Sequence, residues 1–246
     1  MKRINSFLFV ALVSLLFVSC NDDEGYSLND VWRSLATVEN PDDESHFFFT
    51  LDNGTRMWTA ATSNPQYKPK DGQRIIADYT ILSDGPGDGS YQHDVKLIGA
   101  YKVLTKGIFD ITPETQDSIG HDPIKVEDIW IGNDYLNVKF IYKGQNKAHF
   151  INLVSDDEKQ YDDENIHLEF RHNANDDVPT YNMRGIVSFD LISLQNDEVE
   201  SLPLVIHVFE SDESDEKVYE LNYTFNDSFD TDKSFSLGEE LKGEHL

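Results

Sequence analysis

Short runs of strand-forming residues separated by turn residues fill most of this sequence, and they constrain its fold more than any other feature. Residues 46–60 (HFFFTLDNGTRMWTA) hold two apolar runs on either side of Asn53-Gly54. Asn-Gly between such runs predicts a tight β-hairpin in which both turn residues take positive φ. No long apolar pattern with helical spacing follows residue 20. The sequence therefore predicts an all-β fold.

The further predicted strands divide into two groups. They cover residues 73–82, 95–106, 126–132, 135–143, 147–154, 165–172, 184–194, 202–210 and 217–225. Between the groups, residues 110–124 carry two prolines and little apolar content, which predicts a linker or covering loop. The later group of about seven strands suits a β-sandwich. The earlier group suits a small closed barrel such as an OB-fold, although the sequence leaves an SH3-like barrel open.

Charge divides the chain at the same place. Residues 31–123 hold 8 basic and 14 acidic residues, whereas residues 124–246 hold 10 and 28. We therefore predict an OB-type β-barrel domain over residues 31–123, with its linker at 110–123. An acidic, antiparallel β-sandwich domain is predicted to follow over residues 124–246.

The net charge of −26 limits the partners of this protein. It argues against nucleic acid, because neutralisation of phosphates by Lys and Arg dominates that affinity. An anionic membrane surface would repel the chain in the same way, so contact with a bilayer must come through an anchor. We interpret the acidic residues mainly as surface hydration. Binding of divalent cations or of a basic partner stays open.

The N-terminus has the order of a secretory signal, with two basic residues, an apolar run and the small Ser19. The unbroken apolar stretch is about 12 residues long, whereas a membrane-spanning helix takes ~20. FVSC (17–20) resembles a bacterial lipobox, with Phe in place of the usual Leu. We therefore predict a lipoprotein signal peptide at residues 1–19 and acyl chains, palmitate among them, on Cys20. More than one chain is needed for stable anchoring.

Cys20 is the only cysteine. With this residue lipidated, the folded part has no thiol, which excludes disulfides, cysteine-based zinc sites and a thiol nucleophile.

Motifs along nearly the whole chain resemble one family of lipoproteins. They are NDDEGYSLNDVWRSLATVE (21–39), FFTLDNGTRMWTAA (48–61), IWIGNDYLNVKF (129–140), HFINLV (149–154) and LEFRHNAND (168–176). This set resembles the NigD-like lipoproteins of Bacteroidetes, with Asn29 where Gly is common. The resemblance implies an N-terminal OB domain, a C-terminal β-sandwich and no known catalytic residue. Because the family name comes from a bacteriocin gene cluster, it also implies a role in immunity or self-protection.

The resemblance bears on location as well. Asp22, Asp23 and Glu24 follow Cys20 in a predicted acidic tether at residues 20–30. Acids in this position look like the export signal that sends Bacteroidetes lipoproteins to the outer surface of the outer membrane. We expect a lipid anchor in that membrane, facing the cell surface. The periplasmic face and a merely flexible, charged spacer are the alternatives.

Two segments resemble ligand loops only superficially. GPGDG (85–89) lacks the Gly-Lys-Ser/Thr of a phosphate loop, so we predict a β-turn. Asp230 and Asp232 have calcium-loop spacing, but Phe235 and Leu241 stand where an EF-hand needs Gly and Glu. A looser calcium site stays open.

Nothing in the sequence predicts catalysis. His167 and His172 are five residues apart in one predicted strand, so they should point to opposite faces rather than form a zinc pair. No Gly-x-Ser-x-Gly motif is present. We expect no catalytic residue, metal or cofactor, and an enzyme whose site no motif reveals is the alternative.

Aromatic residues provide the only ligand-binding candidates. Trp58, Tyr79 and Tyr101 lie in the predicted barrel, and OB-folds bind through an aromatic-bearing strand face. Core packing is the favoured role for Trp58 and Tyr79. We therefore predict a protein that acts by binding. Its partners are the membrane, through the acyl chains, and an unidentified protein, peptide or glycan.

Overall fold

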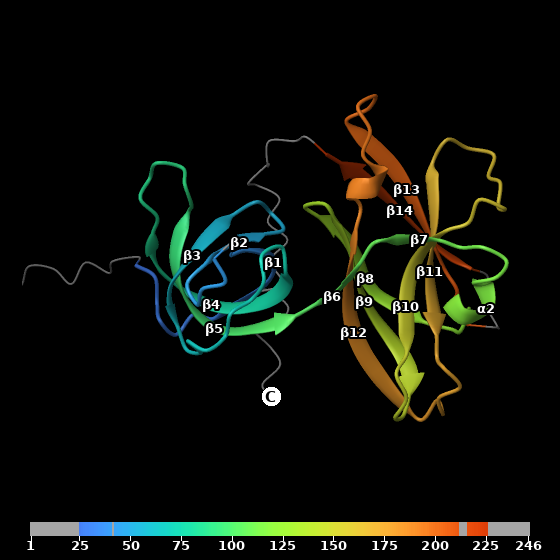
Figure 1. The fold of residues 1–246 in the computed structure, drawn as a ribbon, viewed down its shortest axis with the longest axis horizontal. Helices are drawn as coiled ribbons and strands as arrows, with labels where there is room; N and C mark the ends of the chain where they lie inside the picture. The colour runs from blue at the N-terminus through green and yellow to red at the C-terminus, as the bar shows by residue number, and fades with distance from the viewer. Residues whose placement is uncertain (1–24, 41, 212–215, 226–246) are drawn as a thin grey trace, which may run out of the picture.

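The computed structural model describes residues 25–40, 42–211 and 216–225, and strands and their turns make up nearly all of this part (Figure 1). Within these residues, no helix has the length and apolar character needed to cross a bilayer. Several predictions fall outside the described residues. They concern the signal peptide, Cys20, Asp22, Asp23, Glu24, Asp230 and Asp232.

Five strands close into a barrel in the order β1-β2-β3-β5-β4. They are β1 (Trp32–Glu39), β2 (Phe48–Leu51), β3 (Arg56–Thr62), β4 (Arg74–Asp84) and β5 (His93–Lys102). β3 runs parallel to β5, and the other neighbours are antiparallel. Apolar side chains such as Phe49 and Ile75 fill the interior. The predicted OB-type barrel is confirmed.

The hairpin predicted at Asn53-Gly54 joins β2 to β3, but its turn differs from the prediction. Only Gly54 has positive φ, at 83°. The Asn53 side chain instead accepts a hydrogen bond from the backbone N–H of Thr55, at 3.0 Å. This side-chain bond stabilises a longer loop, and the loop carries Asp52 toward the second domain.

The second domain is a sandwich of two sheets, one ordered β14-β13-β11-β10-β7 and the other β6-β12-β9-β8. Its strands are β6 (Leu104–Lys106), β7 (Ile108–Asp110), β8 (Lys125–Gly132), β9 (Tyr135–Gly144), β10 (Phe150–Ser155), β11 (Ile166–Asn173), β12 (Tyr181–Asp190), β13 (Ser201–Val208) and β14 (Lys217–Thr224). Large apolar side chains from both sheets form one continuous core.

The sandwich prediction is confirmed in architecture, although its sheets are mixed. β7 pairs in parallel with β10, β13 with β11, and β6 with β12. The other strand neighbours in these sheets are antiparallel.

The sandwich begins before the predicted linker. The two prolines and the change in charge predict a linker at 110–123 and a domain boundary after residue 123, and the apolar run at 95–106 predicts one strand. The structure interrupts that run at the buried Val103. β6 and β7 pair only with sandwich strands, so residues 104–110 belong to the second domain. The predicted linker contains one short helix, α2 (Gln116–Ile119).

A buried ion pair of the barrel is hydrogen-bonded to the sandwich. Arg74 of β4 donates to both carboxylate oxygens of Asp52, at 2.5 and 3.0 Å, and to Asn137 of β9, at 3.0 Å. Asn137 in turn donates to Asp52, at 3.0 Å, and accepts from Ser188, at 2.7 Å. Burial raises the pKa of Asp52, and the bonds from Arg74 and Asn137 only partly offset this effect. The network therefore fixes the barrel against the sandwich at a considerable desolvation cost.

The N-terminal segment and α2 lie at opposite ends of the molecule. At the barrel end, the Tyr26 hydroxyl donates to Asp84 at the end of β4, at 2.5 Å, so the chain enters beside the β4–β5 loop. Figure 1 shows α2 at the opposite end of the long axis, on the sandwich. The N-terminal segment and α2 are thus separated by the length of both domains.

Candidate functional site

The outer face of the five-stranded sheet carries an unusual set of polar side chains. Successive residues of a strand point to opposite faces, so Leu168 and Phe170 of β11 enter the sandwich core. His167, Glu169 and Arg171 therefore share the outer face. All three are shielded from solvent, because the segment around α2 and the β10–β11 loop cover this part of the sheet.

A cavity of about 500 Å³ lies over this row of side chains. Its lining consists of Gln116, Asp117, Gly120, His121, Lys159, Arg171 and Glu216. The volume is within the range of small-ligand pockets, ~300–1,000 Å³. We refer to it below as the polar pocket.

One carboxylate holds both cationic side chains of the polar pocket. Glu169 accepts from Arg171 Nε at 2.6 Å and from Lys159 Nζ at 2.5 Å. Burial acts to raise the pKa of Glu169, but Lys159 and Arg171 together hold it below its ordinary value. Glu169 therefore stays ionised, and its two charge-assisted bonds fix the positions of both cations.

His121 completes the inner wall as a neutral ring. Its Nδ1 lies 2.6 Å from Arg171 Nη1, and because a guanidinium can only donate, Nδ1 is the acceptor. Burial and the charge of Arg171 lower the pKa of His121, which agrees with a neutral imidazole. The ring stacks on Phe209 with centroids 4.6 Å apart. The proton of the ring must then sit on Nε2, which makes that atom a donor.

A chain of two histidines continues from the rim of the pocket. Glu216 contacts His207 at 2.8 Å, His207 contacts His167 at 2.9 Å, and His167 contacts Asp163 at 2.7 Å. Tyr161 stacks on His167 with the ring centroids 3.5 Å apart.

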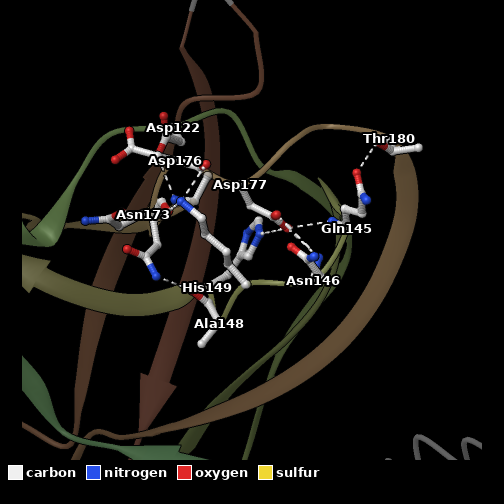
Figure 2. Close-up of polar contacts among 12 residues, drawn as sticks. Asp122, Gln145, Asn146, Ala148, His149, Asn173, Asp176, Asp177 and Thr180 are labelled. Atoms are coloured by element: carbon white, nitrogen blue, oxygen red, sulfur yellow. Dashed lines mark hydrogen bonds and ion pairs between the residues drawn. The ribbon is translucent and has the colours of Figure 1, made fainter.

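A second histidine chain lies on the other face of β11. His172 contacts the Pro123 carbonyl at 3.1 Å and His149 at 2.7 Å, and His149 contacts Asp177 at 3.2 Å. Burial lowers the pKa of His172. Figure 2 shows His149 and the Gln145–Asn146 backbone around the Asp177 carboxylate. These groups, with the Gln145 N–H as the main cause, lower the pKa of Asp177.

We expect His172 to make the protein sensitive to mild acid. The native protein resists protonation of His172, while the unfolded chain takes up that proton below a pH of about 6.5. The free energy of unfolding should therefore fall as the pH drops below that value, by at most about 1.4 kcal/mol per pH unit for one proton. In His172→Asn, this slope should be reduced. Urea denaturation at pH 7.5, 6.5 and 5.5, followed by Trp fluorescence, measures it.

The exposed His46 provides a matched control, because it lies on the barrel, away from the His149–His172 pair. His46→Asn should keep the wild-type slope. The groups facing the His149–His172 pair are Asp177, Asp122 and Tyr142. Equal pH slopes in wild type and His172→Asn would show that the buried ring does not resist protonation.

The aromatic candidates from the sequence are not part of this site. Tyr79 is buried in the barrel core against Phe49, which rules out contact with a ligand there. Trp58 is half-buried and packs on Phe48 at 4.6 Å. Tyr101 is 56% exposed and lines a smaller barrel cavity of about 200 Å³. The structure does not bring the three together.

Sequence reasoning predicted that His167 and His172 lie on opposite faces of one strand, and the structure confirms it. It missed the polar pocket, because the lining residues are far apart in the chain. The one sequence feature that could have indicated the pocket is the pair Glu169 and Arg171, two charged residues that alternate with apolar ones in a predicted strand.

The lining of the polar pocket is made of charged and hydrogen-bonding side chains. Among the residues that the structure describes, it includes no Ser, Thr or Cys. In the described part of the chain, no group of three or more His, Cys, Asp or Glu side chains could hold a metal ion. The arrangement offers fixed hydrogen-bond donors beside a shielded positive charge.

The two folded halves define a class of protein built from an OB barrel and a β-sandwich, and comparisons with known proteins agree. The model of the NigD-like N-terminal OB domain matches residues 35–103. The model of the NigD-like C-terminal beta sandwich domain matches residues 107–223. The chain belongs to the NigD-like family. The sequence has no match among curated proteins.

Solved structures share the whole two-domain fold. A protein from Parabacteroides distasonis ATCC 8503, whose name relates it to a toxin, is 35% identical, with a TM-score of 0.68 over 80% of this chain and 95% of that one. A NigD-like immunity protein from Bacteroides caccae ATCC 43185 is 18% identical, with a TM-score of 0.60 over 81% and 98%. A protein from Bacteroides fragilis NCTC 9343, whose name describes it as a lipoprotein, is 13% identical. Its TM-score is 0.59, and the match covers 80% of this chain and 100% of that one.

Proposed function

We propose that this protein is a lipid-anchored, cell-surface protein of the outer membrane that acts by binding and protects its own cell against a bacteriocin. The observation that carries the binding role is the polar pocket, in which Glu169 fixes two cations beside a cavity of about 500 Å³. No catalytic activity is part of the proposal. Membership of the NigD-like family supports the immunity role.

The N-terminal sequence supports the proposed location. Cys20 follows a short apolar signal, and Asp22, Asp23 and Glu24 follow Cys20. In this arrangement the acyl chains hold the protein on the membrane, and the acids direct it to the outer surface. The acidic folded part contributes no attraction to anionic lipid.

Lipidation is tested at Cys20. We expect wild-type protein to incorporate radiolabelled palmitate and to sediment with the outer membrane. Cys20→Ala should incorporate no label, because the acylated sulfur is lost. Label on Cys20→Ala would contradict the assignment. A variant with Asp22→Asn, Asp23→Asn and Glu24→Gln is the matched control. It should keep the label but lose accessibility to protease on intact cells.

Immunity is tested by deletion of the gene and complementation. The deletion strain should become sensitive to the bacteriocin of its own cluster, and wild-type protein should restore resistance. Cys20→Ala should restore little resistance, because the protein no longer stays at the membrane. Unchanged resistance in the deletion strain would reject immunity.

A second candidate function is glycan capture by the barrel. Phe48 and Trp58 pack together on neighbouring strands at 4.6 Å, and both are half-buried rather than buried. A partly exposed ring such as that of Trp58 stacks on sugar rings, whereas the Arg56 guanidinium lies over the Phe48 ring at 3.9 Å. A glycan array should then show binding that Trp58→Ala removes. An array without binding would reject this candidate.

A further inference from the structure

We infer that the polar pocket is a receptor for a single carboxylate group. This inference deepens the proposed binding function and rests on it. It starts from the hydrogen-bond donors of the inner wall, which belong to three segments far apart in the chain. His121 follows α2, Lys159 lies in the β10–β11 loop, and Arg171 lies on β11.

Each of these three side chains keeps donor capacity for a ligand. Arg171 uses Nε for Glu169 and Nη1 for His121 and Gly120, so its Nη2 has no partner among the described residues. Lys159 uses its ammonium group for Glu169 alone within the same residues. His121 uses Nδ1 as an acceptor, which leaves the N–H at Nε2. All three residues line the cavity.

The charges of the inner wall favour an anion. Arg171 and Lys159 share one carboxylate, Glu169, so the trio keeps one net positive charge. The Arg171 and Glu169 side chains are 6% and 4% exposed, whereas Lys159 is 42% exposed, so solvent screens the charge of Arg171 less than that of Lys159. A ligand carboxylate would neutralise this trio and accept the remaining N–H groups. Arginine is suited to this geometry because its planar fork matches two oxygens.

The rim of the pocket selects a monoanion. Asp117 and Glu216 line the same cavity. Glu216 contacts His207 at 2.8 Å, whereas the Asp117 side chain has no partner in the described part of the chain. A phosphate or sulfate dianion would meet stronger repulsion from these acids than a carboxylate, which brings only one charge. Like charges left facing each other disfavour the wrong ligand.

The carboxylate can come from the C-terminus of a peptide or from a free small acid, and one titration separates the two. The probes are N-acetyl-Ala-Ala-Ala with a free C-terminus, the same peptide as its C-terminal amide, and propionate. The full folded chain without its signal peptide is labelled with ¹⁵N and followed by NMR. We expect both acids to shift the Arg171 Nε–H and the backbone amides of Gly120 and His121. The amide should shift none of them.

The relative affinities identify the source. A peptide acid that binds at least tenfold more tightly than propionate indicates a peptide C-terminus, because the additional contacts then come from the peptide chain. Equal affinities indicate a free acid. Binding of the amide as strongly as the acid would overturn the inference, as would the absence of shifts with both acids.

Lys159→Met is the decisive variant. Lys159 lies in a loop and its side chain is 42% exposed, so we expect the variant to fold as wild type. It should weaken the binding of the acids at least tenfold. Lys96→Met makes the same change at an exposed barrel position and should bind as wild type. Arg171→Lys keeps the charge but loses the fork, and it should also bind more weakly. Full affinity in Lys159→Met would overturn the inference.

These results are independent of the immunity test. A pocket that binds no carboxylate, in a protein that still confers resistance, would reject only the carboxylate inference. A pocket that binds carboxylate, in a protein whose deletion leaves resistance unchanged, would reject only immunity.

Discussion

Replacing Arg74 with Met is expected to lower the free energy of unfolding by about 3–5 kcal/mol at neutral pH. The Arg74 side chain is 0% exposed, and its removal leaves Asp52, 15% exposed, as an unpaired buried carboxylate at the contact between the domains. Urea denaturation measures the loss. The loss should shrink as the pH falls, because burial already raises the pKa of Asp52, and a protonated carboxyl carries no charge to leave unpaired.

Arg56→Met is the matched control for Arg74→Met. Arg56 also bonds both oxygens of one carboxylate, that of Glu39, at 2.7 to 3.2 Å. The two side chains are 33% and 41% exposed, and ion pairs in contact with solvent contribute only about 0–1 kcal/mol. Equal effects of the two substitutions would contradict the interpretation of Arg74 as a buried interdomain residue.

Replacing Phe170 with Ala is expected to destabilise the sandwich by about 3–5 kcal/mol. Phe170 lies on β11 in the five-stranded sheet. Its ring contacts Phe140 and Phe189 of the other sheet, with centroids 5.7 and 6.0 Å apart. Truncation removes the central ring of this cluster and leaves a cavity between the sheets. Thermal and urea denaturation should both show the loss.

Phe109→Ala tests whether burial is the cause. Phe109 lies on the edge strand β7 of the same sheet and is 43% exposed. Its truncation should change the free energy of unfolding by no more than about 0.5 kcal/mol. A loss in Phe109→Ala as large as in Phe170→Ala would contradict the assigned core.

The sequence predicted the strands well where apolar residues alternate with polar ones and turn residues separate the runs. The hairpin after Leu51 and the seven strands from β8 onward are examples. It failed at Val103, because the run from 95 to 106 continues without a turn signal, although the chain changes domain within it. Partner choice between strands depends on contacts across the whole chain, which local patterns do not contain.

The polar pocket could be predicted only in fragments. Glu169 and Arg171 stand out as charges in an otherwise apolar strand, but their function depends on Lys159 and on His121, about fifty residues away in the chain. The contact between His149 and His172 likewise depends on the pairing of β10 with β11. Such long-range register is set by tertiary packing. Spacing rules for metal or catalytic motifs therefore gave no indication of the site.

The position of Tyr26 has a consequence for how the protein would stand on a cell. With the acyl chains proposed on Cys20, the six residues 20–25 can span at most about 20 Å, and Tyr26 is bound to the barrel at Asp84. The barrel would therefore stay close to the lipid headgroups. The sandwich, with α2 at the far end of the long axis (Figure 1), would project away from them. A molecule diffusing toward the cell would then reach the polar pocket before it reached the bilayer.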